Sequence, residues 1–288
     1  MEIVKKIDKC RLVANGLREK GYEIGFVPTM GFLHQGHLSL IRMAKKDCDK
    51  VFISIFINPI QFGPDEDYHN YPRNMKGDSA LAEKEGVDYI FYPEARDMYS
   101  PGHKTFVEVK EMDRIMCGKY RPGHFKGVTT VVIKLFNIIK AHRAYFGQKD
   151  YQQMIIIKKM VEDLNLDIEI ITGPTIREKD GLAISSRNKY LSGEGRKNAV
   201  ILYESLNEAR NMIESGRKDL EEIRKEVLKK IKENVFVNSA DYFEFRDPGT
   251  LKKIIKAGRE QGSVLAAAAI WIGKTRLIDN MIIRTQKR

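Results

Sequence analysis

The chain of 288 residues is poor in cysteine, with only Cys10, Cys48 and Cys117. These residues are odd in number, widely separated and form no Cys-x-x-Cys pair, which argues against a disulfide framework and a zinc site. No stretch reaches the roughly 18 apolar residues that a membrane-spanning helix needs. The first ten residues, MEIVKKIDKC, lack the apolar centre and cleavage site of a signal peptide. We therefore expect a cytoplasmic protein with no membrane partner.

The composition is that of a folded protein, because 42% of the residues are hydrophobic and 31% are charged. The length suits one large or two medium domains, and internal repeats and low-complexity segments are absent from the sequence. The net charge is +11, and residues 188–288 hold 21 Lys and Arg against 14 Asp and Glu. Such a surplus suits either nucleic acid or a small anion such as ATP.

Strand-like and helix-like segments alternate over the first 172 residues. We expect strands at 24–28, 51–58, 87–92, 105–109, 144–146 and 168–172, and helices at 37–48, 79–85, 128–139 and 151–164. The apolar run VFISIFIN at 51–58 is typical of a buried parallel strand. This alternation predicts an α/β fold, with a Rossmann-like doubly wound parallel sheet over residues 1–186.

From about residue 188 the pattern changes to two long amphipathic helices followed by three strand-like runs. We expect helices at 195–216 and 219–235, and strands at 242–246, 264–272 and 277–283. Gly273-Lys274-Thr275 predicts a hairpin between the last two strands. Residues 187–288 are therefore expected to form a smaller C-terminal α+β domain, which we interpret as a lid that joins the first domain near residues 186–189.

The chemically most informative segment is Pro28-Thr29-Met30-Gly31-Phe32-Leu33-His34-Gln35-Gly36-His37, which follows a strand and opens a helix. A helix N-terminus offers free backbone N–H groups and partial positive charge, which suits a phosphate chain. The two glycines allow close approach of a ligand, and the histidines can donate hydrogen bonds to phosphoryl oxygens. By itself, however, His-x-x-His is equally consistent with two ordinary surface histidines.

Four further motifs accompany this segment, and three of them also follow expected strands. They are Asn58-Pro59-Ile60-Gln61-Phe62-Gly63, Arg121-Pro122-Gly123-His124-Phe125-Lys126-Gly127-Val128, Phe146-Gly147-Gln148-Lys149-Asp150-Tyr151-Gln152-Gln153, and Gly173-Pro174-Thr175-Ile176-Arg177-Glu178 continued by Asp180-Gly181-Leu182-Ala183-Ile184-Ser185-Ser186-Arg187-Asn188. Because the carboxyl ends of parallel strands share one edge of a sheet, these loops can converge on one cleft. Together the five motifs resemble those of the pantoate–β-alanine ligase family, within the wider His-x-Gly-His nucleotidyltransferase superfamily. The resemblance covers residues 22–190 and resumes at 276–280.

The resemblance implies that the protein condenses (R)-pantoate with β-alanine to pantothenate at the expense of ATP. The pantoate carboxylate would attack the α-phosphorus of ATP and release pyrophosphate, and β-alanine would then displace AMP from the pantoyl adenylate. The resemblance also implies a homodimer formed through the N-terminal domain. Magnesium is expected to accompany the nucleotide with few protein ligands. Asp78 is a conceivable ligand, but the surrounding residues leave the metal site unassigned.

The resemblance also implies roles for individual residues in ATP binding and catalysis. His34 and His37 would bind phosphates, with His37 the better candidate for proton donor, while Lys149 and Arg187 would supply positive charge. The other residues expected to contact the nucleotide are Met30, Gly31, Gly36, Gly147, Gln148, Asp150 at the ribose, Ile176, Ile184, Ser185 and Ser186. Gln61 and Gln153 suit the hydroxyls and carboxylate of pantoate, and Asn58, Arg121 and His124 are secondary candidates for substrate binding.

Two other functions fit parts of the sequence. The first is another nucleotidyltransferase with a His-x-Gly-His motif, which would stop at a nucleotide-linked product. The motifs Gln61-Phe62-Gly63, 149–153 and 185–188 argue against it. The second is a non-catalytic, basic nucleic-acid-binding protein. The sequence shows no interleaving of aromatic and basic residues and no reader motif, so we expect no nucleic-acid partner.

Overall fold

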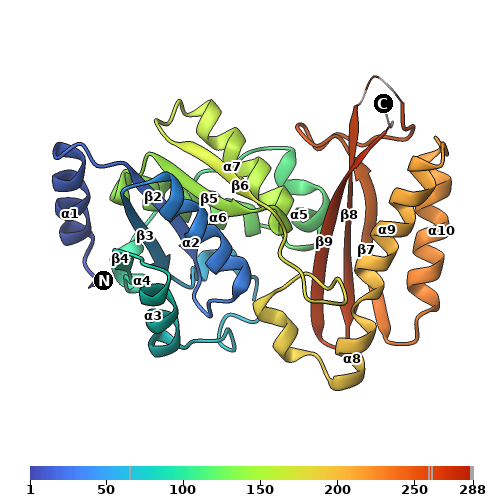
Figure 1. The fold of residues 1–288 in the computed structure, drawn as a ribbon, viewed down its shortest axis with the longest axis horizontal. Coiled ribbons are helices and arrows are strands. Elements are labelled where there is room, and N and C mark those ends of the chain that lie inside the picture. The colour runs from blue at the N-terminus through green and yellow to red at the C-terminus, as the bar shows by residue number, and fades with distance from the viewer. Residues whose placement is uncertain (65, 259, 261, 286–288) are drawn as a thin grey trace. The chain divides into compact units, whose positions relative to one another are not determined.

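The computed structural model describes residues 1–64, 66–258, 260 and 262–285 (Figure 1). The chain folds into two compact units. The first unit comprises Met1–Gln148 and Gln153–Pro174, and the second comprises Lys149–Gln152 and Thr175–Arg288. Among the described residues, no helix is long and apolar enough to cross a membrane.

The first unit contains a six-stranded sheet whose strands all run parallel, in the order β1-β4-β3-β2-β5-β6. The strands are β1 (Glu2–Val4), β2 (Ile24–Thr29), β3 (Lys50–Ile55), β4 (Tyr89–Phe91), β5 (Arg143–Gly147) and β6 (Glu169–Gly173). From β2 the chain first builds outward through β3 and β4, and later returns to the other side of β2 as β5 and β6. The order therefore reverses between β2 and β5, where an open α/β sheet binds its ligands.

Helices cover both faces of this sheet, as expected for a doubly wound fold. The helices along this part of the chain are α1 (Ile7–Glu19), α2 (Gln35–Asp47), α3 (Met75–Lys84), α4 (Ala95–Met98), α5 (Met116–Tyr120), α6 (His124–Ile139) and α7 (Tyr151–Asp163), with short 3₁₀ turns η1 (Pro59–Gln61), η2 (Met112–Arg114) and η3 (Gln148–Asp150). Helices α2 and α3 contribute to one core together with Val27, Ile53 and Tyr145 of the sheet. On the opposite face, Phe136 of α6 makes edge-to-face contacts with Phe26 and Phe146.

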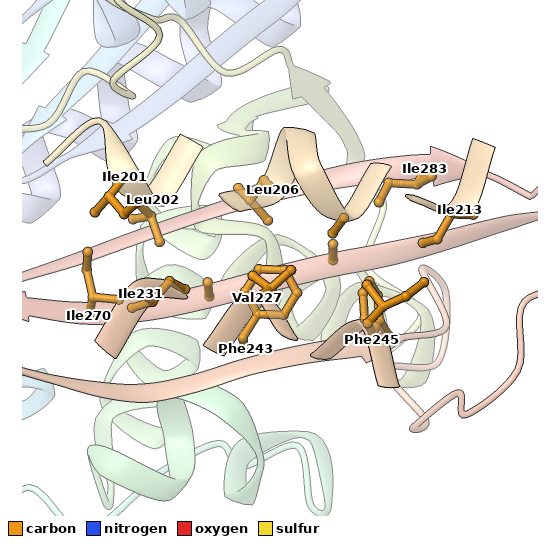
Figure 2. Packing of buried hydrophobic residues seen from close by; sticks show 14 of the residues in the cluster. Ile201, Leu202, Leu206, Ile213, Val227, Ile231, Phe243, Phe245, Ile270 and Ile283 are labelled. Carbon is orange, nitrogen blue, oxygen red and sulfur yellow. The ribbon is translucent and has the colours of Figure 1, made fainter. Parts of the chain in front are cut away.

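The second unit packs two helices on a three-stranded antiparallel sheet of order β7-β8-β9. Its elements are η4 (Ser186–Tyr190), α8 (Gly193–Asn198), α9 (Ile201–Glu214), α10 (Leu220–Glu233), β7 (Val237–Arg246), β8 (Ser263–Ile272) and β9 (Thr275–Arg284). Figure 2 shows Val227 of α10 against Phe243 of β7 and Leu206 of α9 in the same core, and all three side chains are fully buried. Alternate residues of β8, such as Ile270, complete this core.

The α/β fold and the smaller α+β unit are confirmed, and the β8–β9 hairpin has the predicted turn, with Ile272 paired to Thr275. The strand expected at 105–109 is wrong, because this segment pairs with side chains instead of with another strand. The Val107 N–H donates to the Thr130 hydroxyl at 3.0 Å, and the Thr129 hydroxyl donates to the Val107 carbonyl at 2.6 Å. The helix expected at 195–216 is interrupted at residues 199–200. Strand β1 and helix α1 were not expected from the sequence.

We expected the boundary between the two units to follow residue 186, but the structure places it earlier in the chain. Residues from Thr175 onward already belong to the second unit. The reason lies in Arg177, which forms a β-bridge with Ala183 and an ion pair with Asp279 of β9. The hinge expected near 186–189 therefore lies inside the second unit.

Candidate active site

His34 and His37 cap the N-terminus of α2, directly after β2. The Nδ1 atom of His34 accepts a hydrogen bond from the Gly36 N–H at 3.2 Å, and Nδ1 of His37 accepts from the His34 N–H at 3.4 Å. The two rings lie 4.0 Å apart between centroids. Because an Nδ1 that accepts a hydrogen bond carries no proton, each neutral ring holds its proton on Nε2. Both rings can therefore act as Nε2–H donors.

Gly36 lies close to the ring of His34. A Cβ at this position would lie 3.0 Å from Cε1 and Nδ1 of His34, so any other residue would crowd the ring. A glycine at this place in the motif therefore leaves room for the ring of the first histidine.

The loop between β2 and α2 is held by the buried carboxylate of Asp78 in α3. One oxygen of Asp78 accepts from the Phe32 N–H at 2.8 Å, and the other accepts from the Leu33 N–H at 2.7 Å. Gly31 and Phe32 both have positive φ values, 84° and 52°, which a side-chain-bearing residue rarely adopts. Asp78, conceivable from the sequence as a magnesium ligand, instead uses both oxygens to hold this strained backbone.

The segment after β3 brings together three of the predicted residues, Met30, Asn58 and Gln61. Asn58 is 1% exposed and donates through Nδ2 to Oε1 of Gln61 at 3.1 Å and to the Gly127 carbonyl at 3.0 Å. Nε2 of Gln61 contacts the sulfur of Met30 at 3.1 Å. Loops from two adjacent strands therefore meet at the carboxyl edge of the sheet.

The other polar atom of the Asn58 side chain, Oδ1, accepts a hydrogen bond from the hydroxyl of Tyr99 at 2.7 Å. Burial raises the pKa of the Tyr99 hydroxyl above its ordinary value of 10.0, so the proton stays in place at neutral pH. The amide of Asn58 is thereby fixed in one orientation. This role of Tyr99 was not expected from the sequence, where no motif includes it.

Arg121 and His124 form a chain of hydrogen bonds that ends on the backbone of Gln61. Arg121 makes two 2.6 Å contacts with the carboxylate of Glu66, and its Nη1 lies 3.0 Å from Nε2 of His124. Nδ1 of His124 lies 2.9 Å from the Gln61 carbonyl oxygen. A carbonyl only accepts and a guanidinium only donates, so His124 carries its proton on Nδ1. These contacts give Arg121 and His124 a role in positioning Gln61 that the sequence did not predict.

The segment after β5 carries Gly147, Gln148, Lys149 and Asp150. Nζ of Lys149 lies 3.4 Å from Oδ1 of Asp150, and the Lys149 side chain is 19% exposed. A Cβ built at Gly147 would meet no atom within 4 Å, so there is room beside this backbone. Gln153, on the first turn of α7, is half-buried.

In the second unit, Ile176 and Ile184 lie on neighbouring backbone segments, and the Ile184 N–H donates to the Ile176 carbonyl at 2.9 Å. Two of the backbone groups expected near the nucleotide thus bond to each other. Ser185 caps η4 by accepting from the Arg187 N–H at 3.3 Å, which leaves its hydroxyl proton able to donate. Ser186 is buried.

The arrangement in the first unit places a helix N-terminus with two imidazole donors after β2, beside a loop of buried amides after the adjacent strand β3. Among the described residues, no group of three or more His, Cys, Asp or Glu could hold a metal ion.

The sequence profile of the pantoate–β-alanine ligase family matches residues 2–282. The chain belongs to this family.

Relatives and solved structures agree with this membership over nearly the whole chain. The chain is 54% identical to the pantothenate synthetase of Caldicellulosiruptor bescii over 286 residues, which cover 99% of this chain and 100% of the relative. Identity to the Thermotoga petrophila enzyme of the same name is 50%, over 98% and 100% of the two chains. The fold resembles the crystal structure of pantothenate synthetase from Thermus thermophilus, with a TM-score of 0.91, 39% identity, and coverage of 98% and 99%.

A second solved structure carries ligands. The pantoate–β-alanine ligase from Francisella tularensis, complexed with beta-gamma ATP and β-alanine, superimposes with a TM-score of 0.79. It is 37% identical to this chain, and the match covers 98% of this chain and 97% of that one. The family and the fold expected from the sequence motifs are thus confirmed.

Proposed function

We propose that the protein condenses pantoate with β-alanine to pantothenate, using ATP and releasing AMP and pyrophosphate. The observation that best supports this is the juxtaposition of two groups of side chains at the carboxyl ends of the adjacent strands β2 and β3. One is the His34–His37 pair at the start of α2, a donor set for phosphates. The other is the Met30–Asn58–Gln61 cluster, whose neutral amide groups are suited to hydrogen bonds with a hydroxy acid.

In the first step, a carboxylate oxygen of pantoate attacks the α-phosphorus of ATP, and the bond from that phosphorus to the bridging oxygen of pyrophosphate breaks. Negative charge grows on the pyrophosphate as it leaves. The Nε2–H groups of His34 and His37 can donate to these oxygens, with His37 as the proton donor. The free N–H groups at the start of α2 add partial positive charge.

Other residues are proposed to hold the substrates in this step. Lys149 and Arg187 supply positive charge to the phosphates, and Ser185 and Ser186 donate hydroxyl hydrogen bonds. Asp150 accepts from the ribose hydroxyls, and Gly147, Gln148, Ile176 and Ile184 line the nucleotide. Gln61 and Gln153 bind pantoate. Magnesium would enter bound to ATP, since Mg²⁺ is usually held by substrate phosphates and water with few protein ligands.

In the second step, the neutral amine of β-alanine attacks the acyl carbon of the pantoyl adenylate. The new C–N bond forms as the C–O bond to AMP breaks, and the nitrogen loses a proton. Oxide would be too poor a leaving group for direct attack on the carboxylate, so the adenylate supplies AMP in its place. The mixed anhydride must be kept from water, because hydrolysis would waste it.

A homodimer formed through the first unit and a cytoplasmic location are further parts of this proposal. The homodimer is what the family resemblance implies, and the cytoplasmic location is the expectation drawn from the composition of the sequence. The mass in solution, measured by light scattering, tests the dimer directly.

Product analysis tests the reaction. With ATP, Mg²⁺ and pantoate, we expect pyrophosphate to form in an amount equal to the enzyme, and AMP to appear continuously only after β-alanine is added. A nucleotidyltransferase of the same fold would release pyrophosphate and give a stable nucleotide-linked product that no amine converts to AMP. That outcome would overturn the proposal.

A further inference from the structure

Asp279 and Asn280 form a buried polar pair in the middle of the apolar strand β9. Each is 3% exposed, although Leu277 and Ile283 on the same strand belong to the hydrophobic core. The strand is firmly held, because β9 pairs with β8 without interruption from Thr275 to Arg284. Figure 2 shows Ile283 of β9 and Ile270 of β8 in the core beneath the helices. Buried polar side chains are costly unless they make specific bonds, so this pair requires an explanation.

Asn280 bonds to the backbone of Lys149, which is 131 residues away in the sequence. Its Nδ2 donates to the Lys149 carbonyl oxygen at 2.9 Å. Nearby along the chain, the hydroxyl of Tyr151 donates to the Pro248 carbonyl at 3.1 Å. These two bonds explain why the short segment Lys149–Gln152 belongs to the second unit while the residues on either side of it belong to the first.

Asp279 holds a second segment of this unit, the loop that contains Arg177 and Gly181. Its carboxylate binds both terminal nitrogens of Arg177, at 2.5 and 3.0 Å, and one oxygen also accepts from the Asn280 N–H at 2.7 Å. Burial raises the pKa of the Asp279 carboxyl, while the charges of Arg177 and Lys149 lower it. The guanidinium of Arg177 lies 4.4 Å from the ring centre of Tyr203 and donates to the Gly181 carbonyl. Asp279 thus ties the loop that leads to Ser185 and Arg187 to the same strand.

We propose that Asn280 is a positioning residue for Lys149. It fixes the Lys149 backbone on the rigid strand β9, so that the side chain starts from a defined place and its ammonium reaches the phosphates of the nucleotide. A neutral amide is suited to this task. It can donate to the carbonyl, and it adds no second negative charge beside Asp279 to hold the lysine ammonium away from ATP. The inference rests on the role proposed above for Lys149.

A double-mutant cycle tests the proposal. Asn280→Ala removes the donor, and a misplacement of about 1 Å at a reacting group can cost on the order of 10²-fold in rate. We expect Asn280→Ala to lower kcat about 10- to 100-fold, with the KM for pantoate nearly unchanged. In a Lys149→Ala background, the same substitution should lower kcat less than about twofold, because the residue it positions is gone. Equal fold losses in the two backgrounds would overturn the proposal.

Two further variants separate positioning from folding. Asn280→Leu keeps the approximate size and shape of the side chain but has no donor and no charge, so it should show the same kcat loss in folded protein, whether or not the alanine variant folds. The control is Asn207→Ala in α9, which removes an Asn Nδ2 bond to the Tyr203 carbonyl at 3.0 Å within the same unit. It should keep kcat within about twofold. Full activity of folded Asn280→Leu would overturn the positioning role, whereas full activity of Lys149→Ala alone would overturn the role of the lysine in the proposed reaction.

Discussion

The carboxylate of Asp78 accepts a 2.7 Å hydrogen bond from the backbone N–H of Leu33, the residue immediately before His34. Its second oxygen accepts from Phe32, whose φ of 52° lies in the left-handed region. The histidine pair is thus set by a buried acid on a different helix. We therefore infer that Asp78 fixes the geometry of this loop, and a substitution of Asp78 tests the inference.

Asp78→Asn should impair both stability and catalysis. The substituted amide can present only one acceptor, and its NH₂ group would face a backbone N–H. Leaving a buried donor unsatisfied costs about 1–3 kcal/mol. We expect a loss of that size in the free energy of unfolding by urea, together with at least a tenfold lower kcat. Asp97→Asn, which removes a surface ion pair with Lys6, should cost less than about 1 kcal/mol and leave kcat unchanged. Wild-type activity in Asp78→Asn would contradict this account of the loop.

His37→Ala should lower kcat by about 10²–10³-fold, the usual loss when one donor to a developing negative charge is removed. The substitution also removes the acceptor for the His34 N–H, so thermal denaturation must show that the variant is folded. His69→Ala removes an exposed imidazole and is the matched control, with no expected change. Turnover near the wild-type rate in folded His37→Ala would remove His37 from the proposed chemistry.

Glu66 should make stability depend on pH in a defined window. Burial alone would raise the pKa of this carboxyl, but the hydrogen bonds and charge of Arg121 lower it below its ordinary value of 4.5. A carboxyl whose pKa is lower in the folded state stabilises the fold above its unfolded pKa, and this contribution disappears as pH falls through the folded pKa. The difference in unfolding free energy between wild type and Glu66→Gln should therefore be constant above about pH 5 and shrink below 4.5.

Urea denaturation of the two proteins at several pH values between 7 and 3 measures this difference. The KM for pantoate should also rise in Glu66→Gln, because Glu66 holds Arg121 and, through His124, the backbone of Gln61. A difference that grows as the pH is lowered would have the wrong sign for this ion pair.

Leu206→Ala should destabilise the second unit. Leu206 is fully buried between α9 and the sheet, and Leu→Ala substitutions in cores typically cost about 2–5 kcal/mol. Leu12→Ala is the control, because Leu12 is 72% exposed and its loss should change stability by less than about 0.5 kcal/mol. Equal unfolding free energies for the two variants would be inconsistent with the packing in Figure 2.

The sequence predicted those features that depend on local pattern. The apolar run at 51–58 and the alternation of strand and helix predicted the parallel sheet, and the position of His34 at a strand–helix junction predicted the start of α2. The amphipathic pattern at 219–235 likewise predicted α10, with Leu220, Ile223, Val227 and Ile231 buried. These features follow from the periods of helices and strands and need no knowledge of distant contacts.

The supporting contacts could not be predicted, because they join residues far apart in the sequence. Asp78 binds a loop 45 residues earlier, and Asn280 binds Lys149 across 131 residues. Glu66 belongs to none of the sequence motifs. Arg121 and His124 were expected to bind substrate rather than to hold Gln61. The segment 105–109 has strand-like composition, but the hydroxyls of Thr129 and Thr130 on α6 occupy its backbone groups. In each of these places the structure is determined by tertiary contacts and not by the local sequence pattern.

The most direct test of the central claim follows the carboxylate oxygens of pantoate. If pantoate labelled with ¹⁸O in both carboxylate oxygens is converted with ATP and β-alanine, one labelled oxygen should appear in the phosphate of AMP and the other in the amide carbonyl of the product. Mass spectrometry of AMP measures this transfer. Labelled AMP is the result that a pantoyl adenylate requires. Unlabelled AMP, or label in inorganic phosphate together with ADP, would contradict it.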